Sequence, residues 1–197
     1  MKRSIVVLSI IILLLFSLPV YAGPPLDAVQ SNVNKVLEVL RDPELKAASA
    51  KEIEKGKLRL IYDRMFDDVE LSKRTLAKNW NSLNVAQRQE FVLLFRQVLE
   101  KAYIDKILAY TDEKIVFDRE IMVSGTQAEV QTKVVTSSKE IPISYRVLLK
   151  DGAWKVYDVV IENVSLVLNY RTQFNDILAK NKPEQLLEIL RNKVKGQ

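Results

Sequence analysis

The sequence predicts an α+β fold in which helices cover one face of a four-stranded antiparallel sheet, and three observations lead to it. Apolar residues recur at intervals of three and four between residues 26 and 109, which is typical of amphipathic helices. The period falls to two between residues 114 and 161, and helical spacing returns from Ser165 onward. Because the joints between the predicted strands are short, consecutive strands are expected to pair antiparallel.

The first 22 residues have the composition of a secretory signal peptide. Two basic residues precede residues 5–18, which are apolar apart from two serines, and small residues occupy the cleavage positions before Gly23. We therefore expect cleavage after Ala22, export to the periplasm, and one mature domain over residues 23–197. An uncleaved anchor is the alternative, although the stretch is shorter than the roughly 20 residues that span a bilayer.

Composition argues against most enzyme classes. The chain contains no cysteine and no histidine, so thiol nucleophiles, the usual zinc ligands and the commonest general base are all lacking. There is also no glycine-rich phosphate loop and no G-x-S-x-G or H-E-x-x-H motif. We expect neither an enzyme nor a metal site.

After loss of Lys2 and Arg3, 28 basic and 25 acidic residues leave a net charge of +3, which favours anionic lipid or acidic partners over nucleic acid in an exported protein.

Helical spacing predicts three helices before a longer fourth one, at residues 26–40, 50–65, 69–80 and 85–109. Asp68 is the expected N-cap of the third helix, and Asn84 with Gln87 forms a capping box that begins the fourth. The second helix should bury Ile53, Leu60, Ile61 and Met65.

Four strands are predicted at residues 114–122, 127–136, 140–150 and 153–161. Asp151-Gly152 is a two-residue turn of the kind that needs positive φ. In the fourth strand, alternation places Tyr157, Val159 and Ile161 on one face and Val156, Asp158 and Val160 on the other. Asp158 among these valines lies either at the edge of the wet face or buried beside a cation, for which Arg171 is the candidate.

The segment at residues 157–174, YDVVIENVSLVLNYRTQF, resembles the C-terminal signature of the MlaC (toluene-tolerance auxiliary component) family, and the resemblance extends through most of the mature chain. It implies a monomeric periplasmic phospholipid-binding carrier that serves outer-membrane lipid asymmetry. The implied partners are an inner-membrane ABC transporter complex with its MCE-domain subunit and an outer-membrane lipoprotein complex. Phospholipid would be cargo, with no cofactor and no covalent step.

A curved sheet against a long helix leaves a wedge, and the sequence leaves open whether side chains fill it or a lipid-sized cavity remains. The resemblance implies the cavity. The predicted lipid-binding wall is Phe91, Phe95, Val98, Tyr145, Val147, Val159 and Leu166. The predicted headgroup contacts are Arg146, Lys150 and Arg171.

Two other functions remain open from the residues alone. One is a periplasmic interaction or chaperone-like module with a filled core. The other is a small lyase or isomerase with Asp158 as base and Tyr145 or Tyr157 as proton donor.

Overall fold

The computed structural model describes residues 24–109 and 113–196. Its helices are α1 (Pro25–Arg41), α2 (Lys51–Met65), α3 (Asp68–Leu76), α4 (Val85–Leu108), α5 (Leu166–Leu178) and α6 (Pro183–Lys195). Its strands are β1 (Lys114–Ser124), β2 (Gln127–Val135), β3 (Glu140–Lys150), β4 (Ala153–Ile161) and β5 (Val164–Ser165). None of these helices is long and apolar enough to cross a membrane. The predicted signal peptide at residues 1–22 lies outside the described residues.

The α+β prediction is confirmed: the strands form one antiparallel sheet in the order β1-β2-β3-β4-β5. The sheet has one strand more than predicted. β5 is two residues long and pairs with the end of β4, so it is too short to show a period. Glu162 and Asn163 form the turn before it, both with positive φ. The predicted turn before β4 is confirmed, with Asp151 at φ 50° and Gly152 at φ 76°.

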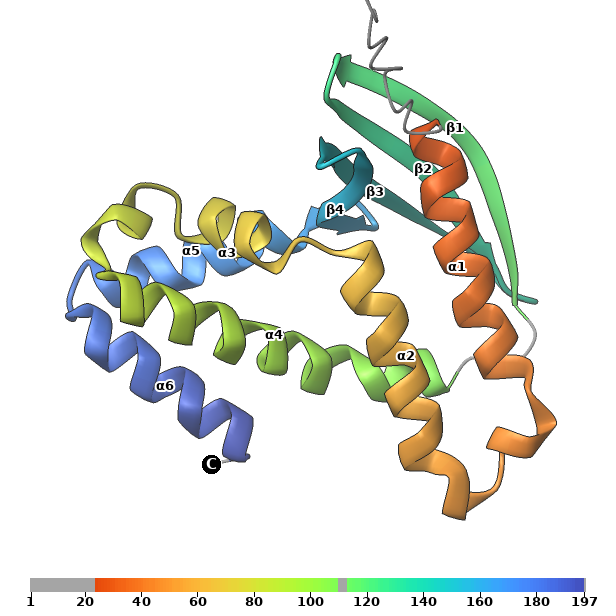
Figure 1. Cartoon of the computed structure of the whole chain (residues 1–197), viewed down its shortest axis with the longest axis horizontal. Coiled ribbons are helices and arrows are strands. Elements are labelled where there is room, and N and C mark those ends of the chain that lie inside the picture. The colour runs from red at the N-terminus through yellow and green to blue at the C-terminus, as the bar shows by residue number, and fades with distance from the viewer. Residues whose placement is uncertain (1–23, 110–112, 197) are drawn as a thin grey trace, which may run out of the picture.

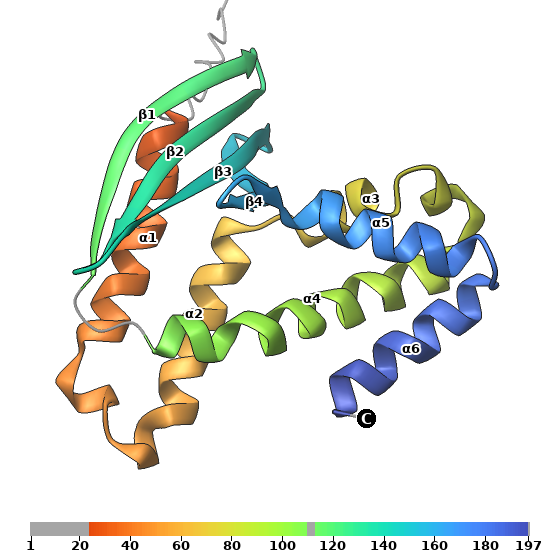
Figure 2. The same ribbon diagram turned by 180° about the vertical axis from the view of Figure 1, so that it is seen from behind.

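The helices form two groups around the sheet (Figures 1 and 2). The long strands curve around α1, which contacts β1, β2 and β4, and α2 packs against α1 and β4. Helices α3, α4, α5 and α6 form a bundle beside the sheet, in which α4 packs on α6 and α3 on α5. Since α5 follows β5 without a loop, the sheet and the bundle are joined directly.

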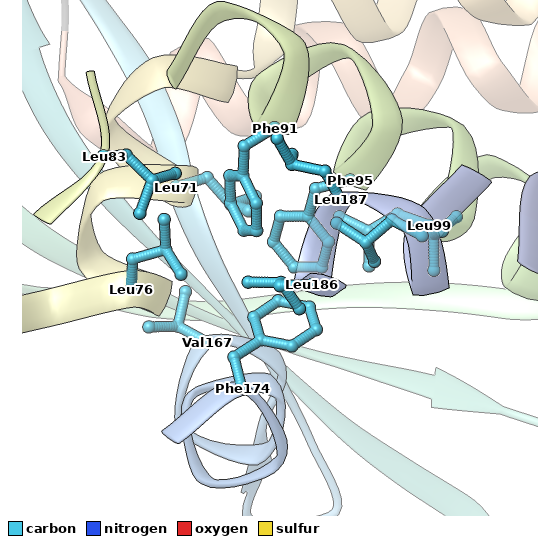
Figure 3. Packing of buried hydrophobic residues seen from close by; sticks show 12 residues of the cluster. Leu71, Leu76, Leu83, Phe91, Phe95, Leu99, Val167, Phe174, Leu186 and Leu187 are labelled. Atoms are coloured by element: carbon cyan, nitrogen blue, oxygen red, sulfur yellow. The ribbon is translucent and has the colours of Figure 1, made fainter. Parts of the chain in front are cut away.

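The bundle has its own apolar core, here called the helical cluster. Figure 3 shows side chains from α3, α4, α5 and α6 pointing toward one another. Phe174 lies 5.5 Å from Phe91 and 5.3 Å from Phe95 between ring centroids, both in edge-on geometry. The cluster comprises Leu71, Leu76, Leu83, Phe91, Phe95, Val98, Leu99, Val167, Phe174, Leu186, Leu187 and Leu190.

The second core lies between the sheet, α1 and the end of α2, and is here called the sheet cluster. Its buried members are Val29, Val33, Leu37, Met65, Ala128, Val130, Val147 and Val156. Half-buried apolar side chains pack around these residues and leave the margin of this core partly accessible.

The predicted inward face of α2 is wrong in part. Ile61 and Met65 are buried as expected, but Ile53 and Leu60 are each about 60% exposed. Because α2 packs on both α1 and β4, its covered face is instead the one that carries Glu54, Leu58, Ile61 and Met65.

The predicted cap of α3 is also wrong, by one residue. Asp67 is the N-cap and accepts a hydrogen bond from the Glu70 amide at 2.9 Å. Asp68 instead accepts from the Tyr62 hydroxyl. The helix ends at Leu76, earlier than expected, because Ala77 has φ 48°. The capping box of Asn84 and Gln87 is confirmed, with both reciprocal bonds at 2.9 Å.

Candidate functional site

The face of the sheet that lies against α1 is almost continuously apolar. On β2, Ala128 and Val130 are at most 1% exposed, and Thr132 beside them donates its hydroxyl to the Ile143 carbonyl. Register places Val147 opposite Ala128 and Tyr145 opposite Val130. Alternation along β2 and β3 therefore gives this face to Tyr145 and to small and branched side chains, as predicted for a half-covered sheet.

A rim of apolar side chains around the sheet cluster remains partly accessible. It comes from α1, the α2–α3 corner and strands β1, β3 and β4, and comprises Leu26, Phe66, Ile115, Phe117, Tyr145, Trp154 and Val159. Half-buried apolar side chains around a buried apolar floor form a surface that hydrocarbon can cover with little desolvation of polar groups. We take the sheet cluster and this rim as the candidate site.

A β-bulge in β4 changes the predicted faces of that strand. Val147 pairs with Val156, but Arg146 pairs with Asp158, so Tyr157 is an extra residue. The prediction that Val156 and Val159 face opposite sides is therefore wrong, since both face α1. Alternation alone cannot reveal an inserted residue.

A second bulge, in β1, places the Glu120 carboxylate on the same face of the sheet as Val156 and Val159. Phe117 pairs with Thr132 and Glu120 with Val130, with the irregularity between Phe117 and Arg119. Glu120 therefore shares a face with Phe117 and accepts a hydrogen bond from the Leu26 amide at 2.9 Å. The amide belongs to the first turn of α1, whose N-cap Pro24 offers no side-chain acceptor. Sequence spacing gave no indication of this contact, because the residues are 94 positions apart.

The structure divides the predicted wall residues between two clusters. Tyr145, Val147 and Val159 lie in or beside the sheet cluster, and Leu166 is half-buried at the start of α5. The three predicted from α4 lie in the helical cluster instead: Phe91, Phe95 and Val98. These two groups do not form a common wall, because α4 packs on α3 and α6 while α1 covers the sheet. The rim residues Phe66, Ile115, Phe117 and Trp154 were not predicted, although the alternation of Ile115 and Phe117 was a usable signal.

Each predicted headgroup residue contacts another group of the protein. Arg146 pairs with Glu129 at 3.4 Å and with Asp158 at 3.1 Å. Lys150 pairs with Asp67, and its pKa is raised by that hydrogen bond. Arg171 donates to the Arg74 carbonyl at 2.6 and 3.0 Å, near the end of α3. A headgroup role for these three residues stays a prediction.

Asp158 is a buried carboxylate with three donors. It is 2% exposed and accepts from Arg146, from the Ser165 hydroxyl at 2.6 Å and from the Val167 amide at 3.0 Å. The predicted partner Arg171 is therefore wrong, and the cation comes from the neighbouring strand. Since the Val167 amide lies in the first turn of α5, Asp158 joins the sheet to the helical bundle.

The residues of the hypothetical lyase site are not brought together. Asp158 pairs with Arg146 and Tyr145 with Val159, so the carboxylate and the Tyr145 phenol lie on opposite faces of the sheet. The Tyr157 ring lies under the Arg74 guanidinium, 3.9 Å from its carbon to the ring centroid. The arrangement around Asp158 is that of a structural carboxylate.

Two open hollows at the surface lie away from the candidate site. One of about 750 Å³ is at the turn between α5 and α6, and one of about 480 Å³ is between α2 and α4. None of the predicted wall residues lines either hollow.

One protein family and two characterised proteins match this sequence. The MlaC protein family matches residues 30–192. The toluene tolerance protein ttg2D of Pseudomonas putida is 25% identical over 166 residues, which are 83% of this chain and 77% of that protein. The intermembrane phospholipid transport system binding protein MlaC of Haemophilus influenzae is 24% identical over 119 residues, 58% of this chain and 56% of that one.

Among solved structures, the fold is similar to that of the phospholipid-binding protein from Ralstonia solanacearum in complex with a phospholipid. The TM-score is 0.80 at 19% identity, over 88% of this chain and 98% of the other. At this identity the likeness shows a shared fold.

Proposed function

Since the chain belongs to the MlaC protein family, whose match covers residues 30–192, we propose that it is an exported carrier of phospholipid. The acyl chains would lie on the apolar face of the sheet, between β1–β4 and helices α1 and α2. The relatives named for phospholipid binding and transport support this proposal. The observation that carries it is the partly accessible apolar rim around a buried apolar floor.

The free energy of burying acyl chains determines how tightly such a carrier holds lipid relative to a membrane. Each methylene removed from water contributes about 0.8 kcal/mol, and a bilayer provides nearly the same. Affinity relative to a membrane is therefore small, and the carrier both loads and unloads. Direction would come from docking to an inner-membrane ABC transporter complex and an outer-membrane lipoprotein complex, and the transfer needs no covalent step.

The test is the lipid content of the protein purified gently from a bacterial envelope. Organic extraction, mass spectrometry and a phosphate assay should find near-stoichiometric phospholipid. An empty extract from folded protein would contradict the proposal and favour an interaction module with a filled core.

A further inference from the structure

Tyr145 places a hydroxyl group on the mostly apolar face of the sheet that lies against α1. Its strand neighbours on this face are Val130, which is fully buried, and Val159. Tyr145 itself is only half-buried and packs at the border of the sheet cluster. The Tyr145 hydroxyl has no hydrogen-bond partner within residues 24–109 and 113–196. In that part of the chain, every side-chain polar atom that is fully buried does have a partner. The Tyr145 hydroxyl is therefore not fully buried and remains accessible to solvent.

The environment of the Tyr145 hydroxyl determines which kind of hydrogen-bond acceptor it can bind. Burial raises the pKa of Tyr145 to about 12, and no charged side chain contributes to the rise. The phenol therefore stays protonated and is available as a donor at neutral pH. A phosphate in an apolar place would need a cation or several donors, whereas no charged side chain of the described residues affects the pKa of Tyr145. A neutral carbonyl needs one donor.

We propose that the Tyr145 hydroxyl donates a hydrogen bond to an ester carbonyl of the bound lipid. Lying between Val130 and Val159, it would fix the depth of the glycerol region, with the acyl chains on the apolar floor and the headgroup toward the rim. The site would then favour diester phospholipids over their diether analogues, whose ether oxygens are poorer acceptors. This inference rests on the proposed function, and its failure can be told apart from failure of that function.

The test compares two probes on the full-length protein purified from the envelope and stripped of lipid: dioleoyl phosphatidylglycerol and its dialkyl ether analogue. Wild-type protein should bind the diester about three- to ten-fold more tightly, as one neutral hydrogen bond would give. Tyr145→Phe should bind both equally, with its affinity for the diether unchanged. Tyr170→Phe is the matched control, because that half-buried phenol lies in the bundle with its ring 5.0 Å from Phe95, and it should keep the preference.

A second measurement does not depend on a variant. With ¹³C-labelled ester carbonyls, the infrared carbonyl band of lipid bound to wild-type protein should include a component shifted to lower frequency, as hydrogen bonding produces. Equal affinity of wild-type protein for both probes, a preference that survives Tyr145→Phe, or an unshifted carbonyl band overturns the inference alone. Failure of both probes to bind wild-type protein overturns the inference and the proposed function together.

Discussion

Glu120 on β1 accepts a hydrogen bond from the backbone amide of Leu26 at 2.9 Å and so holds the first turn of α1 against the sheet. Pro24 and Pro25 begin this helix, and Pro24 provides no side-chain cap. A carboxylate from a bulged strand therefore takes the place of a local cap. The same contact fixes the helix that covers the proposed lipid site.

Glu120→Ala should destabilise the protein by about 1 kcal/mol, the usual cost of losing an N-terminal helix cap. It should also speed lipid release, because α1 is held less firmly over the sheet. Urea unfolding and lipid exchange with labelled vesicles measure the two effects. Glu140→Ala is the control, since that side chain is exposed and pairs with Lys133 at the surface. Equal exchange rates in the two variants would contradict a covering role for α1.

Asp158→Asn should cost about 3 kcal/mol of unfolding free energy. The change leaves Arg146 without its buried partner and weakens the contacts to Ser165 and Val167. We expect the low end of the range for buried pairs because Arg146 is about one-third exposed. Chemical unfolding measures this loss, and Asp176→Asn on the exposed face of α5 should have little effect. Unchanged stability in Asp158→Asn would show that Asp158 does not join the sheet to α5.

Asp67→Asn should lower stability at neutral pH by about 1 kcal/mol, because asparagine keeps the N-cap but loses the pairing with Lys150, which is half-exposed. Burial of Asp67 opposes ionisation, yet Lys150 and the Glu70 amide together hold its pKa below the ordinary 3.8. A carboxyl with a lowered folded-state pKa stabilises above its unfolded pKa and loses that contribution as the pH falls further.

The difference between wild type and Asp67→Asn should therefore be constant from pH 5 to 8 and shrink below about pH 4. Unfolding curves at a series of pH values measure it. A difference that grows on acidification would contradict the assigned direction of the pKa shift.

Val159→Trp should reduce bound lipid several-fold, because the indole would occupy the half-buried position beside Tyr145. Ile177→Trp makes the same kind of change in the half-buried margin of the helical cluster and should leave lipid content unchanged. Both variants should lose about 1–3 kcal/mol from overpacking. Phosphate per folded protein distinguishes them, and a loss of lipid only in Ile177→Trp would move the site to the bundle.

Periodicity was sufficient for most of the fold and insufficient for the site. The four long strands and the capping box of α4 are readable because alternation and capping chemistry are local. The bulges at Tyr157 and between Phe117 and Arg119 are not, and each reverses the face of the residues that follow. Phe91 and Phe95 carry the same aromatic signal as a ligand wall would, but only the packing of α4 on α6 shows that they fill the bundle.

The most direct test of the account is photocrosslinking with a phospholipid that carries a diazirine in its acyl chain, followed by peptide mapping. We predict that the lipid labels residues of the sheet cluster and its rim, such as Ile115, Phe117, Trp154 and Val159. Labelling confined to the helical cluster around Phe91, Phe95 and Phe174 would contradict the account.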